Sequence, residues 1–153
     1  MRVWRLTHPK WKEAAFTGEG SRIAGRRWNP PGWAAVYCAD SLALAMLEVL
    51  VHLAAESRDL IFLAYPVQVP DEAILTLPAS ELPKHWRQEP APENTQSLGE
   101  RWLRRGETLA LQVPSVIVPQ ETNLIINPNH QDFGQVVVGP AEEVGFDSRI
   151  WQG

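Results

Sequence analysis

The most apolar segment of the chain runs from Leu42 to Ala55, and two ionisable residues, Glu48 and His52, interrupt it. The segment is too short to span a bilayer. Its pattern predicts a helix over residues 41–56 that is apolar on nearly every side and therefore buried. Since Glu48 and His52 are four residues apart, they share a face of this helix. Glu48 either forms a structural pair with His52 or an arginine, or it lines a functional cleft, because an isolated buried carboxylate is costly.

Short apolar runs separated by prolines predict most of the remaining elements. Strands are expected over Val3–Leu6, Ala34–Ala39, Leu60–Val69, Leu109–Val113, Val116–Val118, Asn123–Ile126 and Gln135–Val138. Pro66 favours an edge position or a bulge for the third of them. Two further helices are expected, a short one over Ser80–Arg87 and one over Thr95–Arg105 that is capped by Asn94 or Thr95 and stopped by Gly106. The glycines and prolines of Thr17–Gly32 predict a long shaped loop.

The expected fold is a single α+β domain over residues 1–153. Strands outnumber helices, and the connections vary too much for a regular βαβ series. We therefore expect a curved, partly antiparallel sheet packed on the central buried helix. A chain of 153 residues buries enough surface for one such core without further support.

Charge and cysteine content narrow the function classes. Against 18 Asp and Glu the chain has 14 Lys and Arg, a net charge of -4, which argues against a nucleic-acid-binding protein acting alone. The single cysteine, Cys38, excludes an internal disulfide and is expected to be a small core residue. The N-terminus has no apolar stretch of signal-peptide length, so we expect a cytoplasmic protein with no membrane partner.

A glycine-rich loop contains two adjacent arginines, in the run Gly25-Arg26-Arg27-Trp28-Asn29-Pro30-Pro31-Gly32. Guanidinium groups on such a loop suit phosphate or carboxylate recognition, because the planar fork binds two oxygens at once. The glycine spacing excludes a Walker loop and a dinucleotide fingerprint. Taken alone, an arginine pair in a loop is more often simply solvated. The pattern gains interest because the carboxylate of Glu48 follows within the next strand and helix.

A third cluster contains Ser115, which interrupts an apolar strand, and the polar turn from Asn127 to Asp132. A hydrolase triad of Ser115, His130 and Asp132 lacks the nucleophile-elbow pattern Gly-x-Ser-x-Gly. A metal site formed by His130, Asp132 and His52 has no supporting spacing motif, and no metal is expected.

Taken in order, these motifs resemble the RES domain family. The resemblance rests on Gly25-Arg26-Arg27-Trp28-Asn29-Pro30-Pro31-Gly32, Tyr37, Ala45-Met46-Leu47-Glu48, Val113-Pro114-Ser115 and Asn123-x-x-x-Asn127-Pro128-x-His130. The arginine, glutamate and serine of the family name match Arg27, Glu48 and Ser115, and Arg5 resembles a further arginine near the start of these domains. The family often has Gly-Gly-Arg-Trp where this chain has Ala24-Gly25-Arg26-Arg27-Trp28. Arg27 is the favoured main phosphate ligand because it directly precedes Trp28, and Arg26 is the alternative. The segment 70–99 matches nothing in the family pattern.

The resemblance implies the toxin of a bacterial type II toxin–antitoxin pair, with a fold similar to ADP-ribosyltransferase toxins. Such toxins degrade NAD by phosphorolysis or hydrolysis, or transfer ADP-ribose to protein. The implied partner is an Xre-like helix-turn-helix antitoxin that blocks the active site, so that DNA is contacted only through the antitoxin. NAD would be the substrate, phosphate a possible co-substrate, and no bound cofactor is implied.

The resemblance also implies roles for particular residues in cleaving the nicotinamide–ribose bond. Glu48 would stabilise the positive charge that develops on the ribose. Arg27 and Arg5 would bind the pyrophosphate, and Tyr37 would pack against nicotinamide or ribose. Ser115 would hydrogen-bond the nicotinamide side or orient Glu48. Substrate-binding or loop-organising roles are expected for Asn29, Asn127 and His130. A non-enzymatic protein whose apolar helix and tryptophans serve a partner interface is the remaining alternative.

Overall fold

A computed structural model describes residues 1–54 and 60–152 of the chain. The strands in these ranges are β1 (Arg2–Thr7), β2 (Val36–Ala39), β3 (Phe62–Gln68), β4 (Ile74–Thr76), β5 (Ala110–Pro114), β6 (Thr122–Ile126), β7 (Val137–Val138) and β8 (Glu142–Val144). The α-helices are α1 (Glu19–Ala24), α2 (Leu42–Leu50) and α3 (Glu93–Arg105). No helix in the described ranges is both long and apolar enough to cross a membrane.

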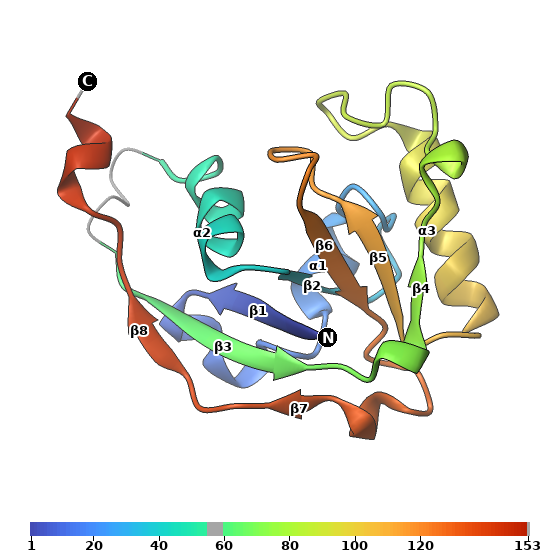
Figure 1. Ribbon diagram of the computed structural model, residues 1–153, viewed down its shortest axis with the longest axis horizontal. Coiled ribbons are helices and arrows are strands. Elements are labelled where there is room, and N and C mark those ends of the chain that lie inside the picture. Colours follow the sequence, from blue (N-terminus) through green and yellow to red (C-terminus); the bar gives the residue numbers. More distant parts are fainter. Residues whose placement is uncertain (55–59, 153) are drawn as a thin grey trace.

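The strands form one curled sheet in the order β4-β5-β6-β2-β1-β3-β7, with β8 also paired to β3. Within the described residues, β4 and β5 are parallel and the other pairings are antiparallel. Figure 1 shows β1 and β3 on one side of the curl and β5 and β6 on the other, with β2 between them. The expected α+β class and the curved, partly antiparallel sheet are confirmed.

The alternation of side chains along β2 divides the core into layers. Val36 and Cys38 point into the curl, where they meet buried side chains of β1, β3, β5 and β6. Cys38 is buried as expected, and burial raises the pKa of its thiol to about 12. Tyr37 and Ala39 point the other way, toward the two long helices.

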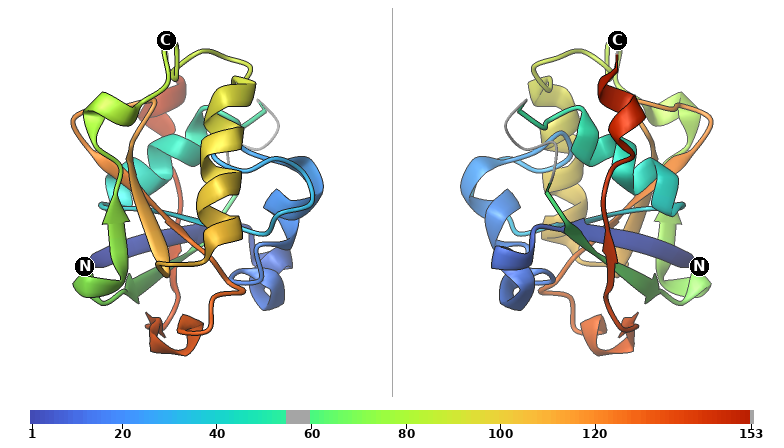
Figure 2. Two further views of the ribbon diagram at one scale, coloured as in Figure 1. Left: turned by 90° about the vertical axis from the view of Figure 1, so that its right-hand side faces the viewer. Right: turned by 90° about the vertical axis from the view of Figure 1, so that its left-hand side faces the viewer.

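The two long helices cover different parts of this outer face. Helix α2 packs on β1 and β2 through Leu44 and Ala45. Helix α3 packs on β5 and β6 through Trp102 and Leu103. Figures 1 and 2 show α3 on one side of the molecule and the C-terminal segment with β8 on the opposite side. The outer face between α2 and α3 therefore contains the last residues of β2 and the first residues of β6.

Helix α2 is shorter and more exposed than the sequence predicts. Ser41 caps it by accepting a hydrogen bond from the Leu44 amide, and the helix ends at Leu50. Leu47 is 38% exposed and Val51 is 56% exposed, so the expectation of burial on nearly every side is wrong. The helix lies at the rim of the sheet, which covers only one of its faces. Residues 55 and 56 of the predicted helix lie outside the described residues.

Proline has a different effect in β3 from the one expected. Strand β3 is not an edge strand, because β1 flanks it on one side and β7 and β8 flank it on the other. Pro66 falls between the residues paired with β8 and those paired with β7, and its carbonyl accepts a hydrogen bond from Gly139. The missing N–H points to the same side as this carbonyl, into the gap between the two short strands.

Four local expectations also need correction. The expected loop over Thr17–Gly32 contains α1, and the expected strand Val116–Val118 is a turn. The expected helix over Ser80–Arg87 is reduced to a 3₁₀ turn at Ala79–Glu81. Helix α3 begins at Glu93, before the predicted caps Asn94 and Thr95, although Gly106 ends it in the left-handed conformation as expected.

A close approach between α3 and the arginine loop generates a stability prediction. A Cβ on Gly99 would lie 1.6 Å from the carbonyl oxygen of Trp28, so Gly99→Ala forces the helix and the loop apart. We expect it to lower the free energy of unfolding by about 1–3 kcal/mol, the usual range for overpacking. Chemical denaturation measures this. Gly20→Ala is the matched control, since a Cβ there meets nothing within 4 Å; equal stability of the two variants would contradict the close contact.

Candidate active site

The Glu48 carboxylate is held by two hydrogen-bond donors at the rim of the outer face. The Ser115 hydroxyl and the Asn123 amide each donate to Glu48 Oε1, both at 2.9 Å. Among the described residues, nothing donates to Oε2 and no cation pairs with the carboxylate. The structural pair with His52 or an arginine is therefore not formed, and His52 lies exposed beyond the end of α2. The half-buried carboxylate is oriented through one oxygen, and the other is left for a ligand.

Ser115 is built into a turn that fixes its hydroxyl. The residue follows β5 and is 1% exposed. Its Oγ accepts hydrogen bonds from the amides of Ile117 and Val118, both at 3.1 Å, while donating to Glu48. With its lone pairs occupied in this way, Ser115 is placed to orient the carboxylate rather than to act as a nucleophile.

Tyr37 lies on the same sheet face as the Glu48 contact. It pairs with Ile125, and two residues further along β2 Ala39 pairs with Asn123. Because side chains on one face repeat every two residues, Tyr37 and Asn123 share a face with about 7 Å between their rows. The Tyr37 hydroxyl donates to Asn29 Oδ1 at 2.6 Å and accepts from the Trp28 amide at 3.2 Å. Burial raises the pKa of Tyr37 far above its usual range, so this hydroxyl stays protonated.

Asn29 organises the arginine loop from inside the protein. It is 0% exposed, and its amide nitrogen donates to the carbonyls of Ser21, Pro30 and Trp33. Its carboxamide oxygen accepts from Tyr37. Because all of these groups are occupied by protein atoms, the expected loop-organising role fits Asn29, and the expected contact with substrate does not.

The Arg27 guanidinium is occupied by the segment 86–89. Nη1 donates to the carbonyls of Trp86 and Gln88 at 2.8 and 2.7 Å, and Nη2 pairs with the Glu89 carboxylate at 2.8 Å. From the same segment, Arg87 donates to the Val116 carbonyl beside the Ser115 turn. The segment that had no interpretation in the sequence therefore connects the arginine loop with the turn that holds Glu48.

Arg26 and Arg5 form the other cationic group near Tyr37. Arg26 is exposed, and its guanidinium makes no ion pair with the described residues. Arg5 is half-buried, with Nε donating to the Ala15 carbonyl and Nη1 to the Tyr37 carbonyl. Burial lowers the pKa of Arg5, the Cys38 side chain opposes this shift, and the positive charge of Arg26 adds a smaller lowering. The guanidinium of Arg26 is therefore more available to a ligand than that of Arg27, the arginine favoured from the sequence.

Asn127 and His130 lie at the opposite end of β6 from the Glu48 contact. Pro114 pairs with Thr122 at one end of the β5–β6 ladder and Ala110 with Ile126 at the other. The ladder is about 13 Å long, and Ser115 and His130 lie beyond its opposite ends. A hydrolase triad of Ser115, His130 and Asp132 is therefore excluded.

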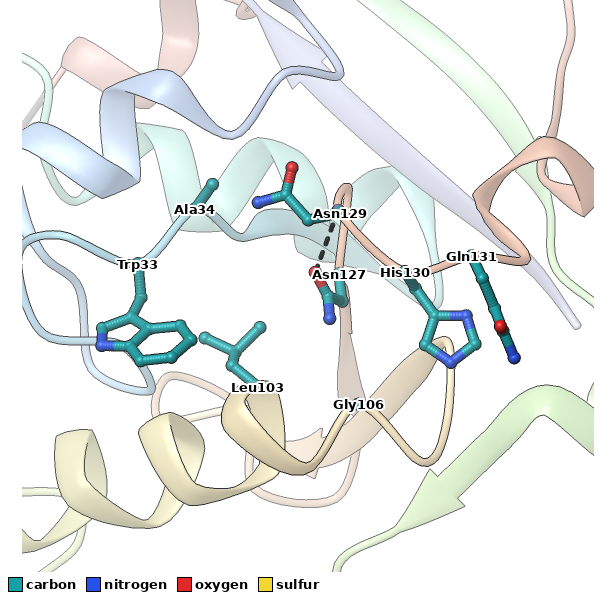
Figure 3. A pocket seen from close by; sticks show the side chains of 8 residues that line it. All are labelled: Trp33, Ala34, Leu103, Gly106, Asn127, Asn129, His130 and Gln131. Carbon is teal, nitrogen blue, oxygen red and sulfur yellow. Dashed lines mark hydrogen bonds between the residues drawn. The ribbon is translucent and has the colours of Figure 1, made fainter.

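The opposite end of β6 forms a pocket of about 250 Å³ that includes Asn127 and His130. Figure 3 shows it between the end of α3 and the turn after β6, with Trp33 and Leu103 as apolar walls. Asn127 accepts a hydrogen bond from the Asn129 amide, and His130 Nδ1 accepts from the Asp132 amide. The structure thus groups these two predicted residues with each other and away from Glu48.

The family resemblance grouped Glu48, Ser115 and Tyr37 in one site and included Asn123 in its motif, but it gave Asn123 no role as a partner of the carboxylate. The signal was present, since Asn123 begins an otherwise apolar strand. A half-buried carboxylate with one free oxygen, on the same sheet face as the Tyr37 side chain, can stabilise a positive charge that develops on a bound ligand.

Comparisons with known proteins identify the family and the fold. The family model described as the RES domain matches residues 2–147. The chain is 39% identical over 146 residues to "Toxin Res" of Yersinia enterocolitica, covering 95% of each chain. It is 43% identical over 152 residues to "Prs ADP-ribosylating toxin" of a Sphingobium species, covering 96% of this chain and 94% of the relative. The fold is similar to a chain in the crystal structure of the M. tuberculosis MbcT–MbcA toxin–antitoxin complex, with a TM-score of 0.76, 21% identity and coverage of 99% of this chain and 86% of the other.

The tyrosine–asparagine contact generates a second stability prediction. Tyr37→Phe leaves Asn29 Oδ1 and the Trp28 amide without their partner. We expect a loss of about 1–3 kcal/mol in the free energy of unfolding, the range for an unsatisfied buried group. Denaturant titration measures it. Tyr65→Phe is the control, because the Tyr65 hydroxyl has no partner among the described residues; an equal loss in both variants would show that the Tyr37 hydroxyl contributes nothing specific.

Proposed function

The chain belongs to the RES domain family, and we propose that it is the toxin of a toxin–antitoxin pair and depletes NAD by cleaving the nicotinamide–ribose bond. The observation that carries this proposal is the Glu48 carboxylate, held through Oε1 by Ser115 and Asn123 with Oε2 free. Its support comes from the geometry of the described residues and from relatives that are named toxins.

The bond to nicotinamide breaks with the electron pair leaving on the ring nitrogen, so nicotinamide departs as a neutral molecule. Positive charge then develops on the ribose, in a transition state similar to an oxocarbenium ion. A carboxylate already oriented toward this charge stabilises it without reorganisation during the reaction. Glu48 Oε2 takes this role, either by facing the ribose or by holding its hydroxyl groups. Phosphate or water then forms the new bond to the ribose carbon, which gives phosphorolysis or hydrolysis.

The pyrophosphate of NAD needs cations to bind it. Arg26 and Arg5 supply them in the proposal, with Arg26 exposed and Arg5 held in place by two carbonyls. Arg27 acts through the segment 86–89 that it holds, rather than through a phosphate. Tyr37 offers its ring to nicotinamide or ribose, since its hydroxyl is occupied within the loop.

An Xre-like helix-turn-helix antitoxin is the proposed partner. The solved mycobacterial structure with a similar fold is a toxin–antitoxin complex, which supports a protein partner for this chain. Contact with DNA would be made by the antitoxin, in keeping with the net charge of -4. The proposed site of action is the cytoplasm, where NAD is abundant.

The test is nicotinamide release from NAD by the purified protein, with and without phosphate. We expect Glu48→Gln to lower kcat by about 10²–10³-fold, as loss of a preorganised transition-state group does. The matched control is Glu100→Gln, which makes the same change at a half-buried carboxylate that is paired with Arg104 on α3. Release by the wild-type protein only with phosphate identifies phosphorolysis. The proposal is contradicted if folded wild-type protein releases no nicotinamide in either buffer, or if Glu48→Gln retains the wild-type rate.

Transfer of ADP-ribose to a protein is the second candidate, because the relative at 43% identity is named an ADP-ribosylating toxin. The same bond breaks, and a side chain of a target protein replaces phosphate or water. NAD labelled in its adenine distinguishes the two outcomes, because the label stays on protein after transfer and remains in small molecules after phosphorolysis or hydrolysis. A chain that binds a partner but neither cleaves nor transfers would fit the non-enzymatic alternative instead.

A further inference from the structure

Asn123 is the second donor to the Glu48 carboxylate, and its backbone is held on both sides. It lies at the start of β6, where it pairs with Ala39 of β2 and with Val113 of β5. From this position its Nδ2 reaches Glu48 Oε1 at 2.9 Å. The amide thus connects a strand that is paired on both sides to a carboxylate on a helix at the rim.

The carboxamide oxygen of Asn123 indicates that the fold does not require an amide at this position. Asn123 Oδ1 is buried and has no hydrogen-bond partner among the described residues. An unpaired buried acceptor is unfavourable, so an amide at this position carries a cost that an apolar residue would avoid. The hydrogen bond to Glu48 is the compensating contact of this side chain. Ser115 differs, because its hydroxyl also accepts from two backbone amides and supports a turn.

We propose that Asn123 is a positioning residue that fixes the orientation of the Glu48 carboxylate, so that Oε2 faces the reacting ribose. This inference rests on the proposed function. With both donors on one oxygen, rotation of the carboxylate would break two hydrogen bonds. With Ser115 alone, the carboxylate is free to turn about a single contact. Because correct orientation matters in the transition state, loss of Asn123 lowers kcat and leaves KM nearly unchanged.

The experiment compares Asn123→Ala and Asn123→Asp in the nicotinamide-release assay across pH. We expect Asn123→Ala to lower kcat by about 10–100-fold with KM within about twofold, the usual effect of removing an orienting group. Asn123→Asp keeps the shape of the side chain but places a second carboxylate beside Glu48. At neutral pH it should be as slow as Asn123→Ala. On acidification one proton is shared between the two carboxyls, which restores a donor to Glu48, so the activity of Asn123→Asp should rise relative to Asn123→Ala.

Asn129→Ala is the matched control, because Asn129 is an exposed amide near the other end of β6 and should leave kcat unchanged. A wild-type kcat in Asn123→Ala, a change in KM alone, or the absence of acid recovery in Asn123→Asp would each overturn the positioning role. These results leave the proposed function intact if the wild-type protein is active. An inactive wild-type protein would overturn both. Circular dichroism of each variant separates loss of activity from loss of fold, and the near-isosteric Asn123→Asp supplies a folded variant if Asn123→Ala does not fold.

Discussion

One carboxylate on an apolar helix determines how the candidate site is arranged. Glu48 is the one acidic residue of α2, and without a partner it would be unfavourable in a half-buried position. The protein places two donors beside it, Ser115 from the turn after β5 and Asn123 from the start of β6. Because these donors come from neighbouring strands, the helix, the turn and the sheet must be in register for the carboxylate to be satisfied. The contact therefore couples the rim helix to the rest of the domain.

The arginine loop depends on a second set of contacts that meets the first through the segment 86–89. Asn29 and Tyr37 hold the arginine loop through hydrogen bonds, while Arg27 donates hydrogen bonds to the segment 86–89. Arg87 then reaches the Val116 carbonyl, next to the turn that supports Ser115. Hydrogen bonds thus connect the arginine loop, the segment 86–89 and the turn after β5 around the outer face between α2 and α3. Through these contacts a substitution far from Glu48 can still change its orientation.

The sequence predicted the parts of this protein that follow from local patterns. The apolar runs of α2 and β2 and the glycine after α3 are short-range signals, and each predicted the correct type of element. Glu48 was identified because a charge in an apolar helix is anomalous. What the sequence could not show was three-dimensional pairing. From the sequence, Pro66 favoured an edge strand or a bulge. The gap between β7 and β8 that accommodates it is formed by chain segments more than 70 residues away, which no local pattern shows. Arg27 is occupied and Arg26 is not because residues 86–89 bind Arg27. Asn127 and His130 are separated from Glu48 because β6 runs away from the Glu48 contact.

In the proposed complex with NAD, Glu48 faces the nicotinamide ribose while Arg26 and Arg5 hold the pyrophosphate. A crystal structure of the Glu48→Gln variant with NAD tests it most directly, because the substitution preserves the shape of the side chain while slowing turnover. We expect the nicotinamide ribose to lie within hydrogen-bond distance of residue 48 and the pyrophosphate to lie beside Arg26 and Arg5. The Tyr37 ring should pack against the nicotinamide or the ribose. NAD bound in the pocket of Asn127 and His130, or anywhere that leaves residue 48 without contact to the ribose, would contradict it.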